Sequence, residues 1–221
     1  MLENSLRYPV EGNAVRRYGI VTLLYALSIF LLPAFILSGY FARAAGNVAQ
    51  GDESPPTFTD WAELLVLGLK TTLASFVYFI LPLGLAILGL ATSFQAISGA
   101  AGATPELGAT SLLLFGGSGL LSLVVMYFFP AAVVAVAVED RIGAAFEFSN
   151  LRPVWGSSDY LVAVALLIAL SFVSSIVTQI LGFTIIGLLF VPAVVFYFSL
   201  VGYYLVGEAY GGILDLRVQE V

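Results

Sequence analysis

The chain has 221 residues, of which 60% are hydrophobic and only 10% charged, and its mean hydropathy is +1.03. Soluble domains are roughly 45–50% apolar and about 25% charged, so this composition predicts a protein of the lipid bilayer. Cys and His are both absent, which removes disulfides, thiol nucleophiles, imidazole bases and most zinc, copper or haem sites. The net charge of −6 lies in the polar segments and argues against nucleic acid as a partner.

The first long apolar run covers 18–41 and follows Arg7, Arg16 and Arg17. It is longer than the roughly 7–15 apolar residues of a signal peptide, so we expect the segment to be retained. Pro33 lies inside the run, and proline lacks a backbone N–H and clashes with the preceding helical turn. The run is therefore either a helical hairpin centred on Pro33 or a single transmembrane helix with a proline kink.

Four further apolar runs are long enough to cross a bilayer, which takes about 20 helical residues. Their backbone must satisfy its own hydrogen bonds, which favours helices, and the alternating short strands of a barrel are absent. The fold class predicted is all-α, an integral membrane helix bundle. These four runs cover about 71–97, 111–138, 159–181 and 183–206.

The positions of the basic residues favour the hairpin in the first run. No Lys or Arg occurs over 71–140 or over 153–216, and each of these gaps holds two apolar helices. By the positive-inside rule, each pair is a hairpin that leaves from and returns to one basic face. A hairpin between Arg17 and Arg43 then brings all eight basic residues, and both termini, to the cytoplasmic face of the cell membrane.

The spacing between Arg17 and Arg43 is too short for two complete crossings. Either the first hairpin is re-entrant, or its legs extend to about Asn13 and Gln50 while Arg43 reaches back to the interface. We treat the chain as one membrane domain with these segments: cytoplasmic arm 1–17, hairpin 18–50, interfacial segment 51–70, hairpin 71–138, interfacial segment 139–158, hairpin 159–206 and cytoplasmic tail 207–221.

The segment 51–70 is predicted to contain an amphipathic interfacial helix. Thr59 is a candidate N-cap, and Asp60 and Glu63 then lie in the first turn, where carboxylates suit the helix dipole. Trp61 begins an apolar face with helical spacing, and Lys70 marks the re-entry into the membrane.

The segment 139–158 is predicted to form a second amphipathic interfacial helix. Ile142, Phe146 and Leu151 are its apolar positions, and Pro153 ends it. Trp155, like Trp61, is interpreted as an interfacial anchor, with ligand binding as the alternative.

Small polar residues share one face of the fourth long run: Ser171, Ser175 and Thr178, with Gln179 beside them. Such a stripe is typical of a helix-packing seam, and a polar permeation path is the alternative. The four later runs carry no Asp, Glu, Lys or Arg near mid-span, which argues against a path for ions or protons.

Two carboxylate pairs, Asp60 with Glu63 and Glu139 with Asp140, could in principle serve acid–base chemistry. They lie at a helix start and at a membrane exit, where solvated charges are the ordinary explanation. We therefore expect no catalytic residue, no cofactor and no metal.

The stretch 30–70 resembles the pattern of an archaeal membrane family, domain of unknown function 4013. The matching residues are Gly39, Tyr40, Arg43, Gly51, Asp52, Pro56, Asp60, Trp61, Glu63, Leu64, Gly68 and Lys70. The stretches 143–155 and 191–210 look similar to the second half of that family, whereas Asn47 stands where a second arginine is expected. The family is distantly similar to the membrane domain of some glycerophosphodiesterases, whose catalytic barrel is not in this chain.

The resemblance implies topology and membrane location, and salt-loving archaea agree with the acidic segments and with Lys70 as the only lysine. Our leading hypothesis is a non-enzymatic polytopic membrane protein, a scaffold, accessory subunit or lipid-associated module. Its expected partners are membrane lipids and a membrane protein or a second copy of the chain. Candidate residues for these contacts are Pro33, Gly39, Tyr40, Arg43, Asp60, Trp61, Glu63, Lys70 and Trp155.

Two other functions stay open on the sequence alone. A transporter or channel for a small or apolar solute would use a cavity lined by Ser171, Ser175, Thr178 and Gln179. An intramembrane enzyme would depend on Asp60 and Glu63.

Overall fold

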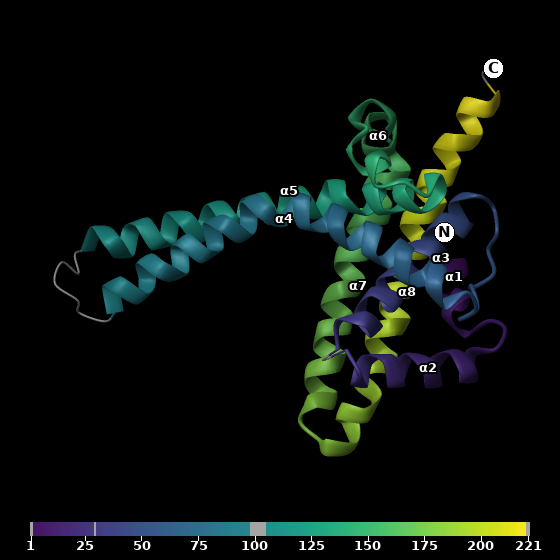
Figure 1. The fold of residues 1–221 in the computed structure, drawn as a ribbon, viewed down its shortest axis with the longest axis horizontal. Helices are drawn as coiled ribbons and strands as arrows, with labels where there is room; N and C mark the ends of the chain where they lie inside the picture. The colour runs from purple at the N-terminus through teal and green to yellow at the C-terminus, as the bar shows by residue number, and fades with distance from the viewer. Residues whose placement is uncertain (1, 29, 98–104, 220–221) are drawn as a thin grey trace. The chain divides into compact units, whose positions relative to one another are not determined.

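The computed structural model describes residues 2–28, 30–97 and 105–219, and these are mostly helical with no strand among them (Figure 1). The predicted all-α fold is therefore confirmed. The elements are α1 (Leu2–Arg7), η1 (Tyr8–Val10), α2 (Ala14–Ala26), α3 (Leu31–Ala49), α4 (Trp61–Ile97), α5 (Pro105–Glu139), η2 (Ile142–Phe146), α6 (Phe148–Trp155), α7 (Ser158–Gly182) and α8 (Ile185–Gln219).

The chain divides into two compact units. Unit 1 comprises Met1–Leu73 and Pro130–Val221, and unit 2 comprises Ala74–Phe129. Unit 2 contains the C-terminal part of α4 and the N-terminal part of α5, joined internally by bonds such as that from Ser118 Oγ to the carbonyl oxygen of Pro82 (2.8 Å). The other helices belong to unit 1, which also contains the candidate site.

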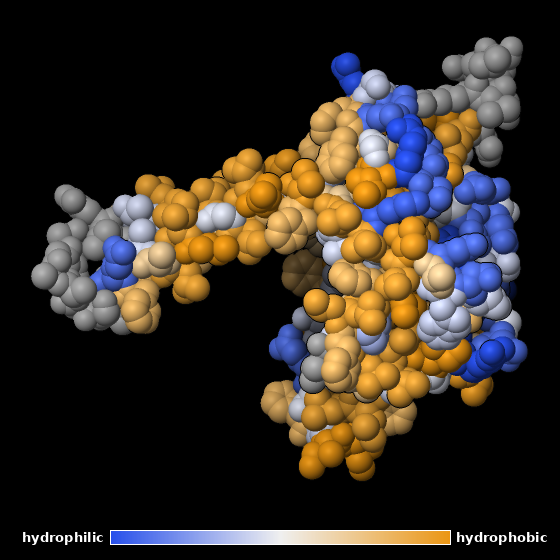
Figure 2. All heavy atoms as spheres, viewed as in Figure 1, coloured by the Kyte–Doolittle hydropathy of each residue, from blue (hydrophilic) through white to orange (hydrophobic). Residues whose placement is uncertain are grey.

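Four helices of the described chain are long and apolar enough to cross a membrane: Trp61–Gln95, Gly108–Glu139, Ser158–Gly182 and Ile185–Leu214. Large apolar side chains cover much of their surface, as the orange areas in Figure 2 show. Exposing so much apolar surface to water would be unfavourable, so these helices indicate a multi-pass membrane protein.

The first apolar run is broken into two helices, as the hairpin prediction requires. Helix α2 ends at Ala26 and α3 begins at Leu31, so the segment is not a single kinked helix. The turn precedes Pro33 rather than being centred on it, because Pro33 occupies the first turn of α3, where a missing N–H has no helical partner to lose. The two legs are capped by Asn13 and Gln50, the limits predicted for extended legs.

The interfacial helix predicted within 51–70 does not exist as a separate element. The part before Asp60 is a loop, and α4 then runs through Lys70 without a break. The first helical bond goes from the Leu64 N–H to the Asp60 carbonyl, so Asp60 and not Thr59 is the N-cap. Helix α4 contains no proline before Pro82, and a single glycine such as Gly68 does not stop a long apolar helix.

The segment 139–158 forms two short helices, η2 and α6, instead of one. Leu151 and Val154 are buried while Arg152 is exposed, so α6 has one packed face. Pro153 lies inside α6 rather than after it, and the chain turns at Ser157, whose Oγ accepts a bond from the Tyr160 N–H (3.2 Å) as the N-cap of α7.

The expected tail 207–221 begins as packed helix, because α8 continues to Gln219. Ala209 and Tyr210 are buried there, so this part belongs to the core of unit 1. The turn of the predicted hairpin 71–138 includes residues 98–104, which lie outside the described residues.

Aromatic rings fix α3 against α8 in the core of unit 1. Tyr40 and Phe41 of α3 both lie 5.6 Å from the ring of Phe196, and Phe41 stacks on Tyr203 at 5.3 Å. These contacts bury most of the second half of α3.

Candidate functional site

Helix α3 is buried along its second half except for one narrow stripe. From Gly39 to Ala49 every residue is buried apart from Arg43 and Asn47, which are half-buried. These two residues are four apart, so they lie on the same face of the helix, one turn from each other. We call them the Arg43–Asn47 stripe, and the neighbouring elements explain why only this stripe is accessible.

Two glycines allow α3 and α4 to cross with their backbones in contact. A Cβ on Gly39 would overlap the carbonyl oxygen of Leu64, and one on Gly68 would overlap the carbonyl oxygen of Phe35. The two glycines therefore form a mutual contact in which neither helix has room for a methyl group. This crossing places the first turns of α4 beside the Arg43–Asn47 stripe.

Helix α8 approaches α3 from another side through a second pair of glycines. A Cβ on Gly207 would lie 2.5 Å from the carbonyl oxygen of Ala45, and one on Gly211 would lie 2.7 Å from that of Ala49. Because Gly207 and Gly211 are one helical turn apart, the contact extends along the helix rather than at one point.

The loop between α3 and α4 is held by Tyr40. Its hydroxyl donates a hydrogen bond to the carbonyl oxygen of Pro56 (2.8 Å), and its ring stacks on Phe58 at a centroid distance of 4.2 Å. Tyr40 is fully buried, so the bond satisfies two polar groups that have left water. The loop consequently forms a fixed wall beside α3.

Ion pairs connect the helices around the stripe. Arg43 Nη2 lies 3.1 Å from Glu63 Oε2, which joins α3 to α4. Lys70 Nζ donates to both the side chain and the carbonyl oxygen of Asp140, each at 2.7 Å, which joins α4 to the end of α5. Both pairs are partly exposed, so each contributes modestly to stability and mainly fixes position.

A third charged group lies in the connection that follows α5. Arg141 donates hydrogen bonds to the carboxylates of Glu139 and Glu147. The hydrogen bond from Arg141 holds the pKa of the Glu147 carboxyl below its ordinary value, and a bond from Asn150 adds to this effect. Glu147 is therefore ionised at neutral pH.

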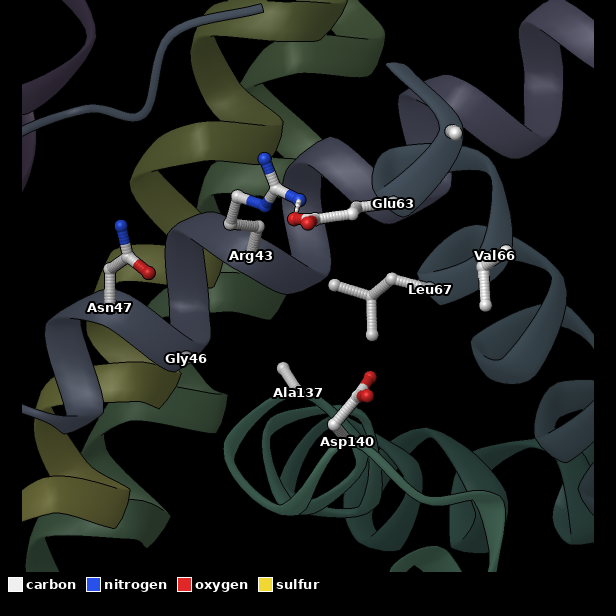
Figure 3. A pocket seen from close by; sticks show the side chains of 9 residues that line it. Arg43, Gly46, Asn47, Glu63, Val66, Leu67, Ala137 and Asp140 are labelled. Atoms are coloured by element: carbon white, nitrogen blue, oxygen red, sulfur yellow. Dashed lines mark hydrogen bonds and ion pairs between the residues drawn. The ribbon is translucent and has the colours of Figure 1, made fainter. Parts of the chain in front are cut away.

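Two hollows open on either side of the Arg43–Asn47 stripe. The larger, of about 550 Å³, lies between α3, α4 and the end of α5 and is shown in Figure 3. Its lining residues are Arg43, Gly46, Asn47, Ala62, Glu63, Val66, Leu67, Ala137 and Asp140. The smaller, of about 310 Å³, lies against the loop and is lined by Arg43, Asn47, Asp52, Ser54, Pro55, Pro56, Thr57 and Thr59. Both hollows therefore have the stripe as their common wall.

A family model described as "Protein of unknown function (DUF4013)" matches residues 24–183, which is most of the chain and includes the stripe and both of its hollows. The chain belongs to the DUF4013 family. The comparisons found no curated protein and no solved structure that matches it.

The residues that carry the DUF4013 pattern at the sequence level meet at the α3–α4 crossing. The structure brings together Gly39, Tyr40, Arg43, Pro56, Glu63, Gly68 and Lys70, through the glycine contact, the Tyr40 bond and the two ion pairs. Most of the matched stretch therefore has an assigned structural role.

Four other predicted residues lie apart from this cluster. Pro33 is at the far end of α3, and Asp60 is an exposed N-cap with a positive φ of 54°. Trp61 is 44% exposed and stacks on Phe58 at 5.7 Å, whereas Trp155 packs on Phe148 at 5.8 Å. Asp60 and Glu63 do not act as a pair, because Glu63 is held by Arg43.

The polar residues of α7 are not among the described residues that line the two hollows beside the stripe. Ser171, Ser175 and Gln179 are exposed on the surface of the chain. The hydroxyl groups of Ser171 and Thr178 donate to carbonyl oxygens of their own helix, and Gln179 donates to Ser175 Oγ (3.2 Å). These hydroxyl and amide N–H groups therefore have acceptors within α7, as polar groups in a membrane span need.

Three residues of this DUF4013 chain have roles in the structure that the sequence did not predict. Asn47 could have been found from its spacing of four from Arg43. Asp140 pairs with Lys70 across a long stretch of chain, and no local pattern indicates such a contact. Arg17 is buried and donates from Nη2 to the carbonyl oxygens of Pro9 and Glu11, both at 2.8 Å, which fixes the N-terminal segment.

Proposed function

We propose that this DUF4013 protein is a non-enzymatic scaffold, accessory subunit or lipid-associated module of the cell membrane, with its basic face and both termini in the cytoplasm. The observation that carries the proposal is the use of the pattern residues at the α3–α4 crossing. Gly39 and Gly68 are in packing contact, Tyr40 holds the loop, and Arg43 and Lys70 are engaged by carboxylates. An arrangement of this kind supports rigidity rather than proton transfer or nucleophilic attack.

The partners proposed are membrane lipids around the apolar helices and a second membrane protein, or a second copy of this chain, bound to the bundle. A transporter or channel for a small or apolar solute is the alternative function. It is favoured less, because the α7 residues that would have lined its path are bonded within their own helix. An enzyme is favoured least, because Glu63 is engaged by Arg43 and, in the described chain, no group of three or more acidic or other metal-ligating side chains could hold a metal ion.

The proposal is tested by extracting the full chain directly into lipid nanodiscs and measuring the mass of the particle by native mass spectrometry. A scaffold is expected to retain a second chain in fixed stoichiometry, so that the protein mass exceeds the 23.5 kDa of one chain. A particle that holds a single 23.5 kDa chain with no partner would contradict the scaffold.

Solute flux distinguishes the alternative function. Proteoliposomes that contain the purified chain are expected to be no more permeable to small neutral solutes than protein-free liposomes. Flux that exceeds this background and is lowered by Gln179→Leu and Ser175→Leu would support a transporter instead.

A further inference from the structure

The Arg43–Asn47 stripe has hydrogen-bonding capacity that the described chain does not use. An arginine carries five N–H donors. In the part of the chain that the structure describes, Arg43 donates only from Nη2, to the Glu63 carboxylate. The side-chain amide of Asn47 has no hydrogen-bond partner among these residues. Both side chains line the two hollows, and Figure 3 shows them among the residues around the larger one.

The larger hollow combines these donors with an apolar floor. Ala62, Val66 and Leu67 of α4 form one side, and Gly46 and Ala137 form the other. An apolar strip then continues from the hollow along α4, since Ala62, Val66, Leu69 and Leu73 are exposed at helical spacing on one face. The site is therefore amphipathic, with donors at one end and hydrocarbon along the other.

The charges around the stripe make the larger hollow the better site for an anion. In the larger hollow Glu63 is countered by Arg43 and Asp140 by Lys70, so the carboxylates are already paired. In the smaller hollow Asp52 lies opposite the stripe, and hydrogen bonds from Ser54 hold its pKa below the ordinary range. An anion is thus repelled less by the carboxylates on the α4 side, which have cationic partners, than by Asp52, whose hydrogen-bond partner Ser54 is neutral.

We propose that the Arg43–Asn47 stripe binds the phosphate group of a membrane phospholipid, with the lipid's hydrocarbon lying in the larger hollow and along the strip from Ala62 to Leu73. The guanidinium N–H groups of Arg43 that Glu63 does not take can donate charge-assisted hydrogen bonds to a phosphate, and the Asn47 amide adds a further donor. The site lies where α3 ends and α4 begins, near the ends of apolar helices, which is the depth of lipid headgroups. This inference goes beyond the proposed scaffold function and does not depend on it.

Binding is tested on the full chain in a maltoside detergent, by calorimetric titration with short-chain phosphatidylglycerol. Inorganic phosphate and a diacylglycerol of the same chain length are titrated in parallel, to separate the headgroup from the hydrocarbon. The phospholipid is expected to bind at least about tenfold more tightly than either part alone. Equal binding of inorganic phosphate would overturn the lipid assignment, and equal binding of diacylglycerol would overturn the role of the phosphate.

Variants show whether the stripe itself holds the phosphate. Arg43→Gln is expected to weaken phospholipid binding by at least about tenfold, the usual scale for one charge-assisted contact. Asn47→Ala leaves the ion pair with Glu63 intact and is expected to weaken binding by a smaller factor. Arg152→Gln removes the same charge from an exposed position outside both hollows, and binding should be unchanged.

Glu63→Gln separates ligand binding from a purely structural ion pair. Removing this carboxylate releases Nη2 of Arg43, so phospholipid binding should be retained or tightened. A loss in Glu63→Gln as large as that in Arg43→Gln would mean that only the ion pair matters. That result would overturn the proposal, as would equal binding by Arg43→Gln and Arg152→Gln.

Discussion

Gly39 and Gly68 are the residues whose size matters most at the α3–α4 crossing, because each meets a carbonyl oxygen of the other helix. We expect Gly39→Ala to force the helices apart and to lower the free energy of unfolding by about 1–3 kcal/mol, the usual cost of overpacking. Thermal unfolding in detergent, followed by circular dichroism, measures the change. Gly19→Ala in α2 is the control, since a Cβ there meets nothing within 4 Å and alanine favours the helix. An equal loss in both variants would contradict the close crossing.

Glu147 gives unit 1 a predictable dependence on pH. Its folded pKa lies below its unfolded value because Arg141 and Asn150 bond to the carboxylate. The stabilisation is therefore complete above the unfolded pKa and is lost as the pH falls through the folded one. Wild type should be more stable than Glu147→Gln at pH 7, and the difference should disappear in acid, below the ordinary carboxyl value of 4.5.

Unfolding of wild type and Glu147→Gln is compared across this pH range, with Glu3→Gln as the control. Glu3 also pairs with an arginine, Arg7, but both side chains are more than two thirds exposed, so its effect should be close to zero at every pH. A difference between wild type and Glu147→Gln that stays constant from neutral pH into acid would show that the carboxylate charge does not stabilise the fold.

At the scale of elements, the number and type of long helices follow from the sequence, whereas several boundaries do not. Apolar length predicts the spans, and the basic residues predict the break in the first run. The prediction that the turn is centred on Pro33 was wrong, because proline fits the first turn of a helix as well as it ends one. Lys70 suggests a membrane entry but does not stop α4, since its ammonium is held at the surface by Asp140.

The candidate site divides in the same way. Arg43 and Glu63 could be recognised from the family resemblance, and Asn47 lies on the same helical face as Arg43. The contribution of Asp140 depends on α5 returning to the start of α4, which is tertiary information. The Gly39–Gly68 contact is likewise invisible locally, because two glycines so far apart in the chain carry no signal of which helix faces which.

Continuity of α4 through Lys70 can be checked by hydrogen–deuterium exchange of the full chain in detergent. The amides from about 65 to 74 should exchange slowly, because each is bonded within one uninterrupted helix. The loop peptide 52–59 serves as the fast-exchanging reference, since it is not helical. Fast exchange confined to residues near Lys70 would contradict a continuous α4 and support the separate interfacial helix that the sequence predicted.

For the whole molecule, the positions of the basic residues and two contacts indicate that the start of α4, the end of α5 and the start of α7 lie at one polar end of unit 1. Lys and Arg are absent from 74–129, which is all of unit 2. Lys70 joins the start of α4 to the end of α5, and the Ala131 N–H donates to the Tyr160 hydroxyl (3.2 Å), which joins that part of α5 to the start of α7. The start of α4 and the end of α5 therefore lie at the same polar end of unit 1, as expected for the two legs of a membrane hairpin.

Single cysteines test the sidedness of this hairpin, because the native chain has no thiol to mask. Moving Arg or Lys across a bilayer is opposed, so the basic end should stay in the cytoplasm. Gly51→Cys should then react with a membrane-impermeant maleimide only after the cytoplasmic side is opened, whereas Ala103→Cys, between the two spans, should react in intact cells. Phe183→Cys at the exposed junction of α7 and α8 is expected to follow Ala103→Cys. Labelling of positions 51 and 103 from one compartment would mean that α4 and α5 do not form a membrane-crossing hairpin, and the phosphate site at Arg43 would lose its place at the headgroups.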